Sequence, residues 1–133
     1  MKKTYKDLIE EAEAQIETWS VDDAKARKDD PKVKFVDLRD IRELHRVGKI
    51  PDAFHAPRGM LEFWVCSESP YHKDFFADAD ATYVLYCQSG WRSALATRAV
   101  QEMGLEPVSH VGEGFRGWKD SGAPTEEVQP RKS

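Results

Sequence analysis

Short apolar runs separated by segments with helical spacing make up most of this chain. Runs of four or five residues predict strands at residues 33–37, 53–56, 82–86 and 107–111. After residue 90, apolar side chains predict a helix that ends before Gly104, with a stripe formed by Leu95, Ala96, Ala99, Val100 and Met103. Strands that alternate with helices indicate an α/β fold with a largely parallel sheet, covered by helices on both faces.

Further helices are expected on either side of these strands. An apolar stripe among acidic residues and lysines predicts an amphipathic helix over residues 5–14, ahead of the main domain. Ser20 precedes two aspartates and predicts another helix start, because a serine cap and first-turn acids both stabilise a helix N-terminus. Short helices are expected at residues 40–45 and around Phe115 and Trp118. No repeat or second-domain boundary interrupts the pattern.

Length and charge narrow the classes of function. The chain has 133 residues, of which 40% are hydrophobic and 33% charged, as expected for one globular domain. Its net charge of −4 argues against a nucleic-acid partner, since such surfaces are usually basic. No apolar run is long enough to span a bilayer, and the first residues do not resemble a signal peptide. We therefore expect no membrane association and a cytoplasmic location.

The cysteines and histidines exclude two kinds of scaffold. Cys66 and Cys87 are too few for a disulfide framework, and a reducing compartment would keep them free. Cys66 is expected to be a small core residue. No paired ligand spacing occurs among the four histidines, so we expect no metal: His45, His55, His72 and His110.

The strand at residues 82–86 leads directly into the segment Cys87-Gln88-Ser89-Gly90-Trp91-Arg92-Ser93. A cysteine between a buried strand and a helix lies where backbone N–H groups converge and the helix dipole is positive, which favours a thiolate. Gly90 permits a positive φ, so that several amides can turn toward one sulfur, and Arg92 adds a cation. The segment predicts a nucleophile and an anion cradle in one loop.

The number of residues between Cys87 and Arg92 separates two chemistries. Tyrosine-phosphatase loops place five residues there, whereas this chain has four: Gln88, Ser89, Gly90 and Trp91. A tighter ring suits one extra sulfur atom better than a tetrahedral phosphate. Sulfur transfer is therefore favoured over phosphate hydrolysis.

Four ordered segments resemble the motifs of the rhodanese-like sulfurtransferases. They are the loop at 87–93, the strand-to-helix segment at 35–44, the turn at 48–53 and the closing segment at 112–124. Lys49 stands where that family usually has histidine, and Asp52 where it usually has glycine. The resemblance implies a mostly parallel five-stranded sheet. It divides the chain into a helical extension (1–15), a rhodanese-like domain (16–125) and a polar tail (126–133) that we expect to be frayed.

The same resemblance implies a double displacement without any cofactor. Cys87 would take a sulfur from thiosulfate or a persulfide and pass it to a thiol or cyanide. Main-chain amides from Gln88 to Ser93 would stabilise the Cys87 persulfide, while Arg92 binds the charged end of the sulfur donor. Thus Gln88, Ser89, Gly90, Trp91, Arg92 and Ser93 form the expected substrate site.

Several roles stay open at this point. Ser93 either orients the sulfur or caps the helix, and Trp91 either forms an apolar rim or packs against another subunit. Asp37 and Arg39 are more simply a structural pair beneath the loop, although Arg39 or Arg58 could reach the substrate. A non-enzymatic module that binds a partner or senses persulfide is the alternative function, and a phosphatase or arsenate reductase is a weaker one. A protein acceptor is an open alternative to a small thiol, and the oligomeric state is left open as well.

Overall fold

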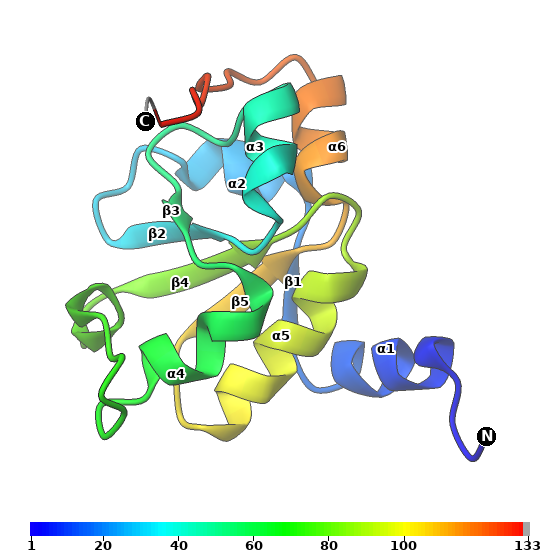
Figure 1. Cartoon of the computed structure of the whole chain (residues 1–133). Helices are drawn as coiled ribbons and strands as arrows, with labels where there is room; N and C mark the ends of the chain where they lie inside the picture. The colour runs from blue at the N-terminus through cyan, green and yellow to red at the C-terminus, as the bar shows by residue number, and fades with distance from the viewer. Residues whose placement is uncertain (132–133) are drawn as a thin grey trace.

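Five strands form one all-parallel sheet in the computed structural model, which describes residues 1–131 (Figure 1). The spatial order is β1-β5-β4-β2-β3. The bounds are β1 (Glu17–Trp19), β2 (Val33–Asp37), β3 (Phe54–His55), β4 (Thr82–Tyr86) and β5 (Val108–Val111). The predicted α/β class and five-stranded sheet are confirmed.

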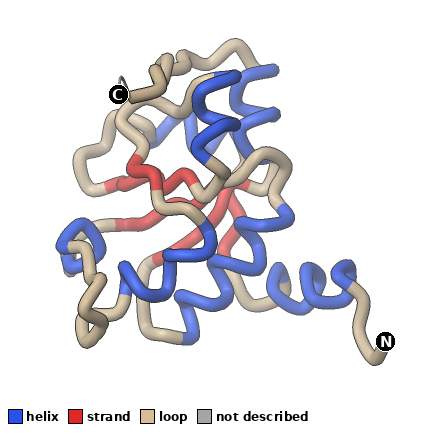
Figure 2. Tube along the Cα trace, viewed as in Figure 1, coloured by secondary structure: helices blue, strands red, loops and turns tan. Residues whose placement is uncertain are grey.

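Helices cover both faces of the sheet. On one face lie α2 (Val21–Arg27), α3 (Ile41–Val47) and α6 (Gly114–Asp120), and on the other lie α4 (Leu61–Val65) and α5 (Trp91–Glu102) (Figures 1 and 2). The predicted N-terminal helix is present as α1 (Tyr5–Glu13) and packs beside α5. Two 3₁₀ turns, η1 (Arg58–Met60) and η2 (Asp74–Ala77), complete the described elements. No helix in this part of the chain is both long and apolar enough to cross a membrane.

The sheet separates two hydrophobic cores. Along β4, Val84 and Tyr86 pack with Trp118 on the α2–α3–α6 side, whereas Tyr83 and Leu85 pack with Val100 on the α4–α5 side. Successive side chains of a strand point to opposite faces, so a strand buried on both sides must be apolar throughout. This explains why the 82–86 run is continuous rather than alternating.

Capping boxes fix the starts of three helices. The side chains of Thr4, Ser20 and Asp40 each accept a hydrogen bond from a backbone N–H of the following turn. In each case the carboxylate of an acid three residues later accepts a hydrogen bond from the backbone N–H of the cap residue. These side chains satisfy amides that have no partner inside the helix. The start predicted at Ser20 is therefore set by local chemistry.

Two elements differ from the sequence prediction. Strand β1 was not predicted, because it is a three-residue edge strand in which only Trp19 is buried. In α5, Ala96 and Val100 of the predicted stripe are buried, but Met103, just past the helix, is exposed, and the smaller or polar side chains of Ser93, Ala94 and Thr97 are buried as well.

The two departures in the 48–53 turn are accommodated by local contacts. Asp52 adopts a left-handed φ of 65°, a conformation for which glycine is usually favoured. The Nζ atom of Lys49 donates to the Ala53 carbonyl at 2.8 Å and pairs with Glu126. Lys49 and Glu126 also exchange two backbone hydrogen bonds, so Glu126, at the start of the tail that we expected to be frayed, is held in place. Residues 132 and 133 lie outside the described structure.

Candidate functional site

The segment 87–93, called here the Cys87 loop, lies at the carboxyl edge of the sheet. It joins the end of β4 to the start of α5, between the ends of β2 and β5. In parallel sheets this edge is where ligands bind, because the loops that follow the strands converge there. Cys87 itself is only 1% exposed.

Three donors or acceptors surround the Cys87 sulfur. The backbone N–H groups of Gly90 and Ser93 donate to Sγ at 3.2 and 3.4 Å, and the Ser93 hydroxyl lies 3.5 Å from it. Gly90 has a φ of 96°, which turns its amide inward. Backbone donors converging on one atom are suited to a negative charge at that atom.

The residues at the start of α6, which follows β5, hold the Cys87 loop in place through backbone hydrogen bonds. The backbone N–H groups of Phe115 and Arg116 donate to the carbonyl oxygens of Cys87 and Gln88 at 2.8 and 3.0 Å. Gly114 has a φ of 63°, and a side chain there would strike the Gln88 backbone. The closing segment, predicted as a family motif with a short helix around Phe115 and Trp118, therefore fixes the loop that carries Cys87.

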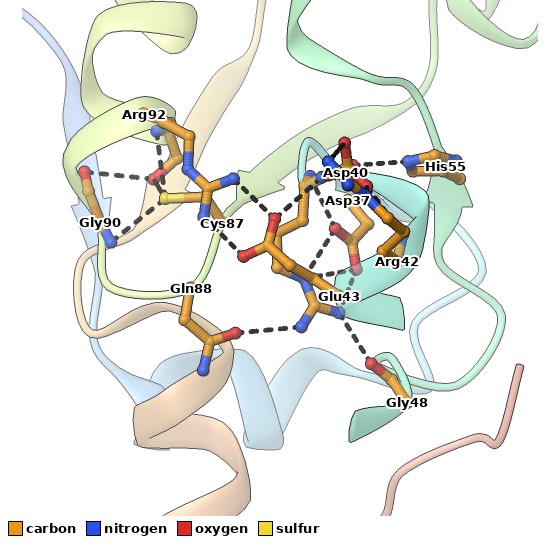
Figure 3. A network of polar contacts seen from close by, with 12 residues as sticks. Asp37, Asp40, Arg42, Glu43, Gly48, His55, Cys87, Gln88, Gly90 and Arg92 are labelled. Atoms are coloured by element: carbon orange, nitrogen blue, oxygen red, sulfur yellow. Dashed lines mark hydrogen bonds and ion pairs between the residues drawn. The ribbon is translucent and has the colours of Figure 1, made fainter. Parts of the chain in front are cut away.

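Arg92 makes a two-point contact with Glu43 on α3. Its Nη1 and Nη2 atoms donate to the Glu43 carboxylate at 2.8 and 3.0 Å (Figure 3). The hydrogen bond to Glu43 is the largest influence that raises the pKa of Arg92, and Coulomb attraction from Cys87 adds to it. Arg92 also lowers the pKa of Glu43. The predicted anion-binding cation thus lies beside the loop with two of its five N–H groups already engaged.

Beneath the loop, Asp37 and Arg39 form the expected structural pair. Both side chains are fully buried, and Arg39 Nη2 lies 2.6 Å from Asp37 Oδ2. The same guanidinium donates to the Gly48 carbonyl at 2.8 Å and to Gln88 Oε1 at 3.1 Å. Burial opposes the charge of Arg39, but the hydrogen bond and attraction of Asp37 outweigh it and raise its pKa. Gln88 is consequently held from below.

Besides Glu43, one further residue at the site was not predicted. His110, on β5, is fully buried, and its Nδ1 atom lies 2.9 Å from the Ser93 hydroxyl. Burial lowers the pKa of His110 to about 4, so its ring is neutral at pH 7. The signal available in the sequence was its position in the 107–111 strand, two residues from Val108, on the face that meets α5.

The remaining predicted residues lie at the rim or outside the loop. Ser89 and Trp91 are exposed, and the Trp91 ring packs against Tyr5 of α1 with centroids 5.0 Å apart. Arg58 pairs with Glu62 at 2.6 Å. Cys66 is half-buried and free. Among residues 1–131, no three His, Cys, Asp or Glu side chains are grouped so that they could hold a metal ion.

Comparison with solved structures finds close likeness in fold. RPA3614 from Rhodopseudomonas palustris, a protein of unknown function described as a possible tyrosine phosphatase, is 45% identical, with a TM-score of 0.91 over 95% of this chain and 96% of its own. The polysulfide-sulfur transferase homodimer from Wolinella succinogenes is 25% identical, with a TM-score of 0.72 over 93% of this chain and 88% of its own.

Comparison of sequences points to the same family. The uncharacterized protein slr1261 from Synechocystis is 37% identical over 90 residues, which cover 66% of this chain and 45% of that protein. The chain spans less than half the length of the curated relatives it matches. The family model described as the rhodanese-like domain matches residues 20–121. This chain therefore belongs to the rhodanese-like domain family.

Proposed function

We propose that this protein is a sulfurtransferase that carries sulfane sulfur on Cys87. The Cys87 thiolate attacks the outer sulfur of thiosulfate, the sulfur–sulfur bond of thiosulfate breaks, and sulfite leaves with the bonding electron pair. A thiol or cyanide then attacks the outer sulfur of the Cys87 persulfide and releases the thiolate. Covalent catalysis of this kind divides one difficult transfer into two easier steps.

The observation that carries the proposal is that two backbone N–H groups donate to a single buried cysteine sulfur, with the Ser93 hydroxyl oxygen 3.5 Å from it. Donors fixed by the fold stabilise an anion without having to reorganise. The Arg92 side chain is still 42% exposed while Glu43 holds it, so its guanidinium can attract the anionic end of a sulfur donor. The likeness to a polysulfide-sulfur transferase supports the same chemistry.

Phosphate-ester hydrolysis fits the loop less well. Only four residues separate Cys87 from Arg92, and the Arg92 guanidinium contacts Glu43 through both of its terminal nitrogens. Thiosulfate and a phosphoryl group would both have to approach Arg92 while Glu43 holds it, so the short ring between Cys87 and Arg92 is what favours sulfur transfer. A binding or persulfide-sensing module would use the same cradle without turnover, so only an assay separates it from the enzyme.

The test is intact mass measurement of the reduced protein after incubation with thiosulfate, followed by cyanide and a thiocyanate assay. We expect a gain of one sulfur atom that cyanide removes as thiocyanate. Cys87→Ser should gain none, whereas Cys66→Ser, the matched control, should behave as wild type. Failure to take up sulfur from either thiosulfate or glutathione persulfide would contradict the proposal, and hydrolysis of p-nitrophenyl phosphate instead would favour the phosphatase.

A further inference from the structure

A buried polar chain leads away from the Cys87 sulfur into the sheet. Ser93 Oγ lies 3.5 Å from Cys87 Sγ on one side and 2.9 Å from His110 Nδ1 on the other. All three side chains are at most 1% exposed. Register pairs His110 of β5 with Leu85 of β4, two residues before Cys87, which brings the ring under the loop.

The unpartnered nitrogen of the His110 ring determines the direction of the hydrogen bonds that join His110, Ser93 and Cys87. Its Nε2 atom is buried and has no hydrogen-bond partner among the described residues. A neutral imidazole carries one N–H and one bare nitrogen. Buried N–H groups without a partner are rarer in proteins than acceptors without one, because each lost donor bond costs free energy. The ring is therefore expected to keep its proton on Nδ1, facing Ser93.

A proton on Nδ1 determines what the Ser93 hydroxyl can do. When the Nδ1 N–H donates to Ser93 Oγ, the hydroxyl proton is free to point elsewhere. It has two acceptors, Cys87 Sγ at 3.5 Å and the Gly90 carbonyl at 3.3 Å. Donation to a charged acceptor is the stronger of the two, so the proton turns to the sulfur whenever Cys87 is a thiolate.

We propose that His110 is a positioning residue, which acts through Ser93 to supply a third hydrogen-bond donor to the Cys87 thiolate. This inference rests on the proposed function and deepens it. The thiolate is present before the first transfer and is the leaving group of the second, so the same donor serves both steps. No proton is transferred between His110, Ser93 and Cys87, and His110 stays neutral in both steps.

The tautomer of His110 can be measured directly on the wild-type protein. In the reduced protein labelled with ¹⁵N-histidine, long-range ¹H–¹⁵N correlation spectra distinguish a proton on Nδ1 from one on Nε2, and His110→Asn assigns the signal. We expect a neutral ring protonated on Nδ1. A ring protonated on Nε2 would accept the Ser93 proton and leave the sulfur without it, which overturns the proposal.

Reactivity of Cys87 provides the second test, because alkylation by iodoacetamide follows the thiolate. Ser93→Ala and His110→Leu should each slow alkylation at pH 7 by about tenfold, the size expected for one hydrogen bond to a charged group. The double variant should be no slower than either alone. His110→Asn places an amide N–H near the former Nδ1 and should recover most of the rate.

Two results would contradict this scheme. One is a folded His110→Leu protein that is alkylated at the wild-type rate. The other is a His110→Asn variant as slow as His110→Leu, since a merely structural role would not be restored by one donor. Neither alkylation nor the tautomer depends on sulfur transfer, so failure of the proposed function would be seen separately, in the thiosulfate assay.

Discussion

Two glycines of this chain have nearly the same backbone angle, but only one lies in the Cys87 loop. Gly90 has a φ of 96° and Gly104 a φ of 101°. A Cβ atom at residue 90 would collide with the Gly112 carbonyl oxygen, whereas one at residue 104 would meet nothing within 4 Å. Substitution of Gly104 would therefore cause backbone strain alone, whereas substitution of Gly90 would cause the same strain and a steric collision at the site.

We expect Gly90→Ala to displace the loop, abolish sulfur uptake and destabilise the fold by more than about 2 kcal/mol. Gly104→Ala, at the end of α5, should cost only the left-handed conformation, roughly 1–2 kcal/mol, and keep full uptake. Urea unfolding and intact mass after thiosulfate treatment measure the two effects. Equal uptake by both variants would show that the loop tolerates the collision.

His110 makes stability depend on pH. Its pKa is about 4 in the folded protein and about 6.5 in the unfolded chain. Between these values the unfolded chain binds a proton that the folded protein does not, so the free energy of unfolding decreases as pH falls. Well above pH 6.5 His110 is neutral in both the folded and the unfolded protein, and its contribution to the pH dependence vanishes.

We expect the titration of His110 to make the free energy of unfolding about 2 kcal/mol smaller at pH 5 than at pH 7.5. Urea unfolding at the two pH values should show this loss in wild type, and His110→Asn should show a correspondingly smaller one. An identical loss in the variant would assign the pH dependence to other groups.

At the scale of elements, a buried ion pair connects β2, the Cys87 loop and the turn after α3. Arg39 reaches Asp37, Gln88 and Gly48 at once. The Arg39 guanidinium also lies over the ring of Phe115 in α6, with its Cζ atom 4.3 Å from the ring centroid. Removing one partner of such a pair leaves an uncompensated buried charge, which is far more costly than losing an exposed pair.

Asp37→Asn should therefore destabilise the protein by about 3–5 kcal/mol and loosen the loop. The matched control is Asp40→Asn, which breaks the exposed pair with Arg42 but keeps a good helix cap, and we expect no measurable change in stability. Thermal unfolding of both variants is the measurement. Similar melting temperatures would mean that the buried charge is compensated from elsewhere.

At the scale of the whole molecule, α1 is an addition beside the sheet and its covering helices. It precedes the matched family region and packs on α5 through Ile9 and Ala12, while Tyr5 contacts Trp91 at the loop rim. None of its residues belongs to the two cores around the sheet. The sheet and its covering helices should thus fold without this contact.

Ile9→Asp, which places a charge in the interface, should release α1 without unfolding the domain. Hydrogen exchange should then show lost protection in α1 and retained protection in β4. Leu8→Asp is the control on the same helix, because Leu8 is 43% exposed. Loss of protection in β4 as well would show that α1 is required for the fold.

The sequence by itself determined the parallel α/β class, most of the elements and the loop that presents Cys87. Those features depend on periodicity, capping and turn chemistry, which act between neighbours in the chain. The edge strand β1 was not predicted, because three residues with one buried side chain show no periodic pattern. The burial of Ser93, Ala94 and Thr97 on α5 was not predicted either, because these side chains are small or polar and their burial reflects helix packing rather than hydrophobicity.

Only the tertiary structure decided where the long polar side chains at the site point. Arg92 meets Glu43 and Gln88 meets Arg39, each across 49 positions of the chain, and Ser93 meets His110 across 17. A guanidinium, amide or hydroxyl is satisfied by whichever partner the sheet register brings within reach. That choice depends on how β2, β4 and β5 align, which no local pattern of residues encodes.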